Sequence, residues 1–139
     1  MTATISRPKT SNWKTSNIPN LKGKTALITG ANSGLGYYTA KALAEKNAHV
    51  VIACRSLEKA NQTIKKLRGL NPKGIFTPLE LDLSDLKNVV EVQSKICNDF
   101  ENLDLLINNA GIMHPPKTLS AQGYEIQFAV NHLAHMLLT

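Results

Sequence analysis

The chain has 139 residues, of which 42% are hydrophobic and 19% are charged. This composition is typical of a globular protein and excludes a disordered, collagen-like or membrane-embedded polypeptide. The formal net charge is +6, and the first acidic residue is Glu45, so the whole excess precedes it: Arg7, Lys9, Lys14, Lys22, Lys24 and Lys41.

The charge distribution argues against a nucleic-acid-binding protein, whose basic residues would spread over a binding face. Aromatic residues make up only 5% of the chain, and no zinc-finger spacing is present. Cys54 and Cys97 are not spaced as a metal-binding pair, so we expect reduced thiols in a cytoplasmic protein.

Residues 1–20 predict a flexible basic arm, which has no acidic residue and is rich in Ser, Thr and Asn. Organelle transit peptides share this composition, so organelle targeting is the alternative to a plain arm. No run approaches about 18 apolar residues, and we therefore expect no integral membrane segment.

Beyond the arm, short apolar runs alternate with segments of helical period. In the first half we expect strands over 25–29 and 49–53 and helices over 35–46 and 57–70. The first helix would turn Leu35, Ala42 and Leu43 to a sheet, and the second would turn Leu57, Ala60, Ile64 and Leu67.

In the second half we expect strands over 75–81 and 103–107. Ser84 is the expected N-cap of a helix that ends near Phe100 and buries Val89, Val92 and Ile96. A final helix over 123–139 carries Tyr124, Phe128, His132 and Met136 at its repeating positions.

Strands separated by helices pair in parallel through right-handed crossovers. The sequence therefore predicts an α/β fold, a doubly wound parallel sheet of the Rossmann type with strand order 3-2-1-4. The last residues, 136–139, carry no helix-ending signal, so we expect a domain over 21–139 that is truncated after the fourth strand and its following helix. The fourth strand would then be an open edge, which favours poor solubility or oligomerisation.

The turn between the first strand and the first helix reads Thr29-Gly30-Ala31-Asn32-Ser33-Gly34-Leu35-Gly36. A glycine-rich turn at a helix start exposes unpaired N–H groups and favours a bound phosphate. Gly30 would allow the sharp exit from the strand, Gly34 the approach of a diphosphate, and Gly36 close packing of helix on strand. The turn lacks the Lys of a nucleoside triphosphatase loop, and a purely structural turn is the alternative.

The end of the second strand indicates which dinucleotide would bind. An acidic residue there would accept the free ribose 2′-hydroxyl of NAD(H), but the segment 53–57 has none and carries Arg55. The guanidinium group suits a 2′-phosphate, so the sequence favours NADP(H) over NAD(H). The alternative is that Arg55 is a solvated loop cation.

Three motifs together resemble the short-chain dehydrogenase/reductase superfamily: the glycine turn, Asp82-Leu83 after the third strand, and Asn108-Asn109-Ala110-Gly111 after the fourth. The resemblance covers about residues 21–139. Ala53-Cys54-Arg55 and Val130-Asn131-His132-Leu133-Ala134-His135 are most similar to the retinol-dehydrogenase-like branch and to light-dependent protochlorophyllide reductase.

The resemblance implies a role for each matching position. It places the diphosphate and the adjoining ribose at Gly30, Ser33, Leu35 and Gly36, and the 2′-phosphate at Arg55 and Ser56. The adenine would meet Asp82 and Leu83, and Asn109, Ala110 and Gly111 would line the cofactor. Asp82 could instead cap the next helix, and we expect Asn108 to tie neighbouring strands together.

Asn131 matches the family's catalytic asparagine, whose main chain is thought to hold a water in a proton relay. A structural role is the alternative. His132 and His135 could suggest a metal-ligand pair, but no third ligand is apparent, so we expect no metal.

Family members that transfer hydride use a Ser on the fifth strand and a Tyr followed four residues later by Lys. Tyr37 and Lys41 have this spacing but belong to the first helix, where the family does not place its acid, and we interpret the pair as coincidental.

Three functions remain open. The first is the cofactor half of an NADP(H)-dependent oxidoreductase that acts on a hydroxyl or carbonyl of an apolar small molecule. We expect the full-length parent of this enzyme to be a homo-oligomer. The second is light-dependent reduction of a double bond, as in protochlorophyllide reductase, although Asn108-Asn109-Ala110-Gly111 fits the dehydrogenases better. The third is a non-catalytic nucleotide-binding remnant.

Overall fold

The computed structural model describes residues 13–139, which form a four-stranded sheet in the order β3-β2-β1-β4. All neighbouring strands are parallel, which confirms the predicted doubly wound topology. After β3 the chain returns to the other side of β1, so the direction of winding reverses between β1 and β4. The strands are β1 (Thr25–Thr29), β2 (His49–Cys54), β3 (Ile75–Glu80) and β4 (Leu105–Ile107).

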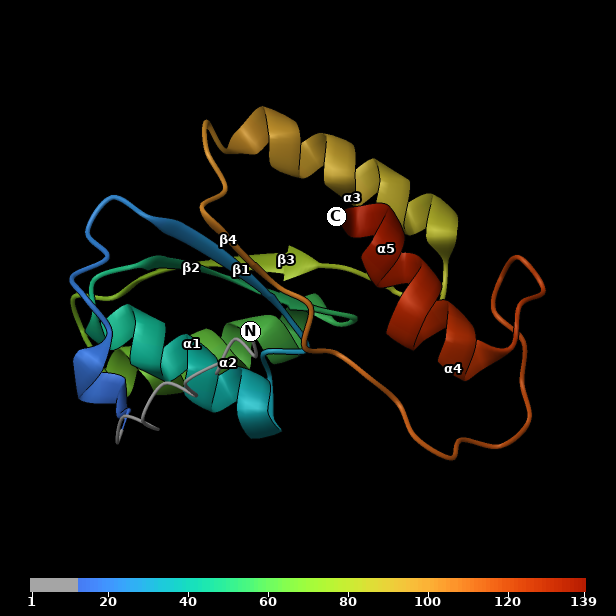
Figure 1. Ribbon diagram of the computed structural model, residues 1–139, viewed down its shortest axis with the longest axis horizontal. Coiled ribbons are helices and arrows are strands. Elements are labelled where there is room, and N and C mark those ends of the chain that lie inside the picture. Colours follow the sequence, from blue (N-terminus) through green and yellow to red (C-terminus); the bar gives the residue numbers. More distant parts are fainter. Residues whose placement is uncertain (1–12) are drawn as a thin grey trace, which may run out of the picture.

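Helices cover both faces of the sheet (Figure 1). On one face lie α1 (Gly34–Glu45) and α2 (Leu57–Leu70). On the other lie α3 (Leu86–Asp99) and a final helix in three parts: α4 (Ile126–Phe128), a turn of π geometry, η2 (Ala129–Leu133), and α5 (Ala134–Leu138).

The sheet is buried on both faces because successive side chains of a strand point to opposite layers. In β2, Val50 and Ile52 pack with α1 and α2, whereas Val51 and Ala53 pack with α3 and the final helix. This explains why β2 reads as an uninterrupted apolar run in the sequence.

The helix faces differ from prediction in three places. In α2, Leu57 is 43% exposed and does not face the sheet, whereas Ala60, Ile64 and Leu67 are buried as predicted. In α1, Leu35 is 80% exposed, and the buried residues are Gly36, Ala40 and Ala44, because the helix approaches the sheet through small side chains. Tyr124 lies before the final helix and is exposed, as are Phe128 and Met136 within it, whereas Ala129, Val130, Ala134, His135 and Leu138 are buried. The π turn begins at Ala129 and takes about one residue more than an α turn, so the buried positions from there on depart from a plain helical period.

Side-chain caps fix where α3 and the final helix begin, and the pattern of apolar residues does not show which side chain forms each cap. Asp85, and not Ser84, caps α3, since its carboxylate accepts a hydrogen bond from the Lys87 N–H at 3.0 Å. The last helix starts at Ile126, later than predicted, because the Glu125 carboxylate accepts from the N–H groups of Gln127 and Phe128.

The arm predicted over residues 1–20 lies partly outside the described residues, which begin at Trp13. Thr15–Asn17 form a short 3-10 helix, and the Lys46 ammonium group donates to the Ser16 carbonyl at 3.1 Å. Within residues 13–139, no helix has both the length and the apolar character needed to cross a membrane.

Two helical glycines have opposite surroundings. A Cβ added to Gly36 would lie 2.5 Å from the Asn109 Nδ2 and 2.6 Å from the Gly30 carbonyl oxygen. A Cβ added to Gly69, near the end of α2, would meet no atom within 4 Å. Gly36 is therefore a point of close contact between α1 and the sheet, and Gly69 is not.

We expect Gly36→Ala to lower the free energy of unfolding by about 2 kcal/mol, because the added methyl group must displace main-chain atoms. The matched Gly69→Ala change should be neutral or stabilise by about 0.5 kcal/mol, because alanine is the better helix former. Urea unfolding followed by circular dichroism gives both values. Equal effects of the two substitutions would contradict this assignment of Gly36.

Candidate functional site

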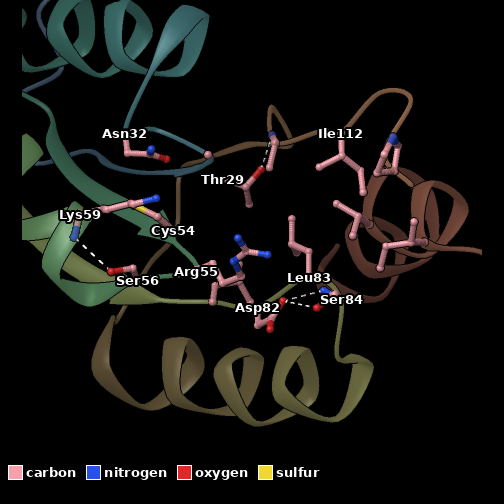
Figure 2. Close-up of a pocket in the computed structure, with 18 of the residues that line it drawn as sticks. Thr29, Asn32, Cys54, Arg55, Ser56, Lys59, Asp82, Leu83, Ser84 and Ile112 are labelled. Carbon is pink, nitrogen blue, oxygen red and sulfur yellow. Dashed lines mark hydrogen bonds between the residues drawn. The ribbon is translucent and has the colours of Figure 1, made fainter. Parts of the chain in front are cut away.

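A pocket of about 500 Å³ opens at the carboxyl ends of the strands, where the direction of winding reverses. Ligands of open α/β sheets bind at this position. Its walls come from the ends of β1, β2 and β3, from the segment after β4, and from Ile126 and Val130 of the final helix (Figure 2). Seven of the predicted site residues line it: Gly30, Arg55, Ser56, Asp82, Leu83, Ala110 and Gly111.

The β1–α1 turn has the backbone that the glycine pattern predicts. Gly30 has φ +66° and Gly34 has φ +54°, both in the left-handed region that favours glycine. A Cβ on Gly30 would also lie 2.9 Å from the Ala110 Cα. Gly30 is therefore required for the close approach of the turn to the segment after β4.

The start of α1 lies beside the pocket and not in its lining. Ser33 is the N-cap residue, but its side chain makes no capping hydrogen bond, and Ser33, Gly34 and Leu35 are all exposed. The N-terminal amides of α1 thus lack the side-chain partner that usually satisfies one of them. This is the arrangement that an anion at a helix start requires.

Positive charge gathers at the end of β2. Arg55 extends from this strand into the pocket (Figure 2), and Lys59, one turn farther along the chain, also lines it. Ser56 caps α2 by accepting a hydrogen bond from the Lys59 N–H at 3.3 Å. Neither cation has a carboxylate within 4.0 Å among residues 13–139, where the ion pairs are Lys24–Asp104 and Lys41–Glu45.

Lys59 is a pocket residue that the sequence analysis missed. The available signal was its closeness to Arg55 in the sequence, since the two residues flank the start of α2 at Leu57. Cys54 also lines the pocket, and burial raises the pKa of its thiol to about 11, although the Lys59 charge acts in the opposite direction. The thiol therefore stays protonated and acts as a packing group.

Asp82 and Leu83 line the pocket after β3, as expected. The Asp82 carboxylate accepts hydrogen bonds from the Ser84 N–H at 2.9 Å and from the Ser84 hydroxyl at 2.6 Å (Figure 2). These bonds form a local turn and do not cap α3. The alternative role of Asp82 as the cap of the next helix is therefore wrong.

Asn109, and not Asn108, ties the strands together. Its side-chain amide donates to the Thr29 carbonyl at 2.9 Å, and its N–H donates to the Thr29 hydroxyl at 3.0 Å. Asn108 points the other way and donates to the Thr139 hydroxyl at 3.1 Å. The sequence could not distinguish these neighbours, because β4 ends at Ile107 and the chain turns immediately after it.

Asn131 lies in the π turn beside the pocket wall. Its side chain accepts a hydrogen bond from the Ile112 N–H at 2.9 Å and donates to the Ile112 carbonyl at 2.8 Å. This paired contact holds the segment that follows Gly111. Asn131 is not itself among the residues that line the pocket.

The two histidines considered as a ligand pair have different surroundings. His132 is exposed and stacks on Phe128, with ring centroids 5.4 Å apart, whereas His135 is buried. Residues 13–139 contain no group of three or more His, Cys, Asp or Glu side chains able to hold a metal ion.

The comparisons with known proteins agree with this geometry. The family model described as short chain dehydrogenase matches residues 24–139. Human retinol dehydrogenase 13 is 43% identical over 119 residues, which is 86% of this chain and 36% of that protein. The chain thus spans about a third of the length of this relative.

Solved structures share the fold. An uncharacterized protein from Mycobacterium paratuberculosis has 38% identity and a TM-score of 0.80, covering 91% of this chain and 44% of that one. A metagenomic short-chain oxidoreductase in complex with NADP has 27% identity and a TM-score of 0.73, covering 86% and 54%. An oxidoreductase from Haemophilus influenza with bound NAD has 28% identity and a TM-score of 0.68, covering 87% and 49%.

Of these similar structures, one thus holds NADP and another holds NAD. The family match extends over nearly all the described residues, and the relatives and structures agree with it. The chain belongs to the short-chain dehydrogenase family, within its retinol-dehydrogenase-like branch.

Proposed function

We propose that the pocket binds NADP(H) in preference to NAD(H). The observation that carries this proposal is the pair of cations, Arg55 and Lys59, at the end of β2, where neither has a carboxylate partner among the described residues. A 2′-phosphate there would accept charge-assisted hydrogen bonds from both side chains. Since similar solved structures hold NADP in one case and NAD in another, the local charge is the feature that favours NADP(H) here.

The rest of the dinucleotide would lie along the carboxyl edge of the sheet. Its diphosphate fits the exposed start of α1, where the amides of Ser33, Gly34, Leu35 and Gly36 are available. Asp82 and Leu83 would contact the adenine, and Ala110 and Gly111 would line the nicotinamide half. Asn109 does not line the pocket, so its part in cofactor binding would be to hold Ala110 in place through its bonds to Thr29. Ser56 contributes a hydroxyl beside the two cations, although its oxygen also caps α2.

We expect Arg55→Ala to weaken NADPH binding by about tenfold to a hundredfold, the value of a charge-assisted contact, and to leave NADH binding nearly unchanged. Lys59→Ala should act in the same direction with a smaller effect, because an ammonium group cannot bind phosphate through two parallel bonds. Fluorescence titration with both cofactors measures these changes.

Lys66→Ala is the matched control, since it removes one positive charge from an exposed position of α2 that does not line the pocket. This control should leave both affinities unchanged at moderate salt. Equal affinity of the unmodified protein for NADPH and NADH would refute the preference.

We further propose that the whole protein transfers hydride between this cofactor and a hydroxyl or carbonyl of an apolar small molecule. The far wall of the pocket supports this substrate class, because Ile112, Pro115, Ile126 and Val130 are apolar. The bound nicotinamide would supply or accept the hydride. Asn131 would hold the wall at Ile112 and offer its main chain to the proton relay that the family resemblance implies.

The family's Tyr-x-x-x-Lys acid has no counterpart in the pocket. Tyr37, with Lys41 four residues later, lies on α1 and packs against the core between α1, α2 and the sheet. This chain spans 36% of human retinol dehydrogenase 13, and we therefore propose that the remaining part of the relatives' length would supply the proton-transferring residues.

We expect the full-length protein to transfer deuterium from [4-²H]NADPH to apolar aldehydes, measured by mass spectrometry of the alcohol product. Asn131→Ala should lower kcat by about tenfold to a hundredfold, in the range of one positioned relay group. Binding of NADPH without transfer, in the dark and in the light, would contradict the proposal and favour a remnant. Deuterium found on a reduced carbon–carbon double bond, and only under illumination, would favour the double-bond reductase.

A further inference from the structure

His135 is a buried histidine to which the proposed function assigns no task. Only 6% of its surface is exposed. Its Nε2 lies 2.8 Å from the Thr29 hydroxyl oxygen, and its Nδ1 lies 3.3 Å from the main-chain oxygen of Asn131. The ring therefore connects the end of β1 with the π turn of the final helix.

The hydrogen bonds around Thr29 determine which ring nitrogen carries the proton. A hydroxyl group has two lone pairs and one proton. The N–H groups of Asn109 and Ala110 donate to the Thr29 oxygen at 3.0 and 2.9 Å, and together they occupy both lone pairs. The hydroxyl proton must then be donated, either to the His135 Nε2 at 2.8 Å or to the Ile107 carbonyl at 3.5 Å. The shorter contact makes Nε2 the acceptor.

A ring whose Nε2 accepts a hydrogen bond is neutral and carries its proton on Nδ1. The Nδ1–H group then donates to the Asn131 carbonyl, which is the geometry observed. A positively charged ring would instead direct an N–H group at an oxygen with no free lone pair. Burial acts in the same direction, because it lowers the pKa of His135.

The two partners of this ring, Thr29 and Asn131, each hold one end of the same segment of the pocket wall by hydrogen bonds. Thr29 holds the start of the segment 109–112 through the Asn109 and Ala110 amides, and the Asn131 side chain holds its end through both main-chain groups of Ile112. Gly111 lies between these two sets of hydrogen bonds, and a Cβ on it would be 3.5 Å from the Asn131 Oδ1.

We propose that His135 is a positioning residue: as a neutral ring protonated on Nδ1, it couples Thr29 to the Asn131 main chain and so fixes the Ala110–Ile112 wall against which the cofactor binds. The importance of this wall rests on the proposed function. The ring would touch neither substrate nor cofactor, since it does not line the pocket.

The first test uses the unmodified protein without cofactor. A long-range ¹H–¹⁵N correlation spectrum at neutral pH should give His135 a protonated-type Nδ1 signal and an unprotonated-type Nε2 signal. A proton on Nε2, or on both nitrogens, would overturn the proposal. Because no ligand is added, this result does not depend on whether NADPH binds.

The second test compares variants of the two histidines. His135→Phe keeps an aromatic ring but removes both hydrogen bonds, and His135→Asn keeps a donor near the place of Nδ1. We expect His135→Phe to speed hydrogen exchange at the Ala110 and Ile112 amides and to weaken NADPH binding, each by about tenfold, the worth of about one hydrogen bond. His135→Asn should restore the slower exchange at Ile112.

His132→Phe is the matched control, because His132 is exposed on the same helix and lies outside the pocket lining. It should change neither exchange nor binding. Unchanged exchange at both amides in His135→Phe would mean that the ring only fills space, and would overturn the proposal. If this variant does not fold, the tautomer in the unmodified protein decides. If the unmodified protein binds no NADPH, the proposed function fails, while the tautomer and exchange results still test His135.

Discussion

The contact between the β1–α1 turn and the segment after β4 is the constraint on which the rest of the site depends. Thr29 accepts hydrogen bonds from the Asn109 and Ala110 amides, and Gly30 comes so near to Ala110 that a side chain on it would collide with the main chain. This contact lies at the carboxyl ends of the neighbouring strands β1 and β4, where the direction of winding reverses. It leaves the start of α1 exposed on one side and the pocket open on the other.

Charge and apolar surface are separated within the pocket. Arg55 and Lys59 occupy the end near β2, and Ile112, Ile126 and Val130 occupy the end near the final helix. A molecule with a phosphorylated end and a flatter, less charged end can satisfy both regions without burying an unpaired charge. Phosphate recognition and the proposed hydride chemistry would thus take place at opposite ends of one cavity, with Gly30 and Ala110 between them.

Much of this arrangement could be predicted from local sequence. The glycine turn, the alternation of strands and helices, and the residues that follow each strand indicated the sheet order and seven residues of the pocket. Other features depended on contacts between distant segments. Whether Asn108 or Asn109 reaches Thr29, which face of α1 is buried, and whether Asp82 or Asp85 caps α3 were each decided by packing that a period of apolar residues does not encode.

The sequence by itself determined the class of fold and seven of the residues that line the pocket, because turn glycines, apolar runs and the residues after each strand act over a few neighbouring positions. The tertiary structure decided how the parts are held. It brought Arg55 and Lys59 into one pocket with the segment after β4, placed Asn131 on Ile112, and buried His135 between Thr29 and the π turn. These contacts join positions up to 106 residues apart, and a hydrogen bond over that separation exists only once the sheet and its two helical layers have packed.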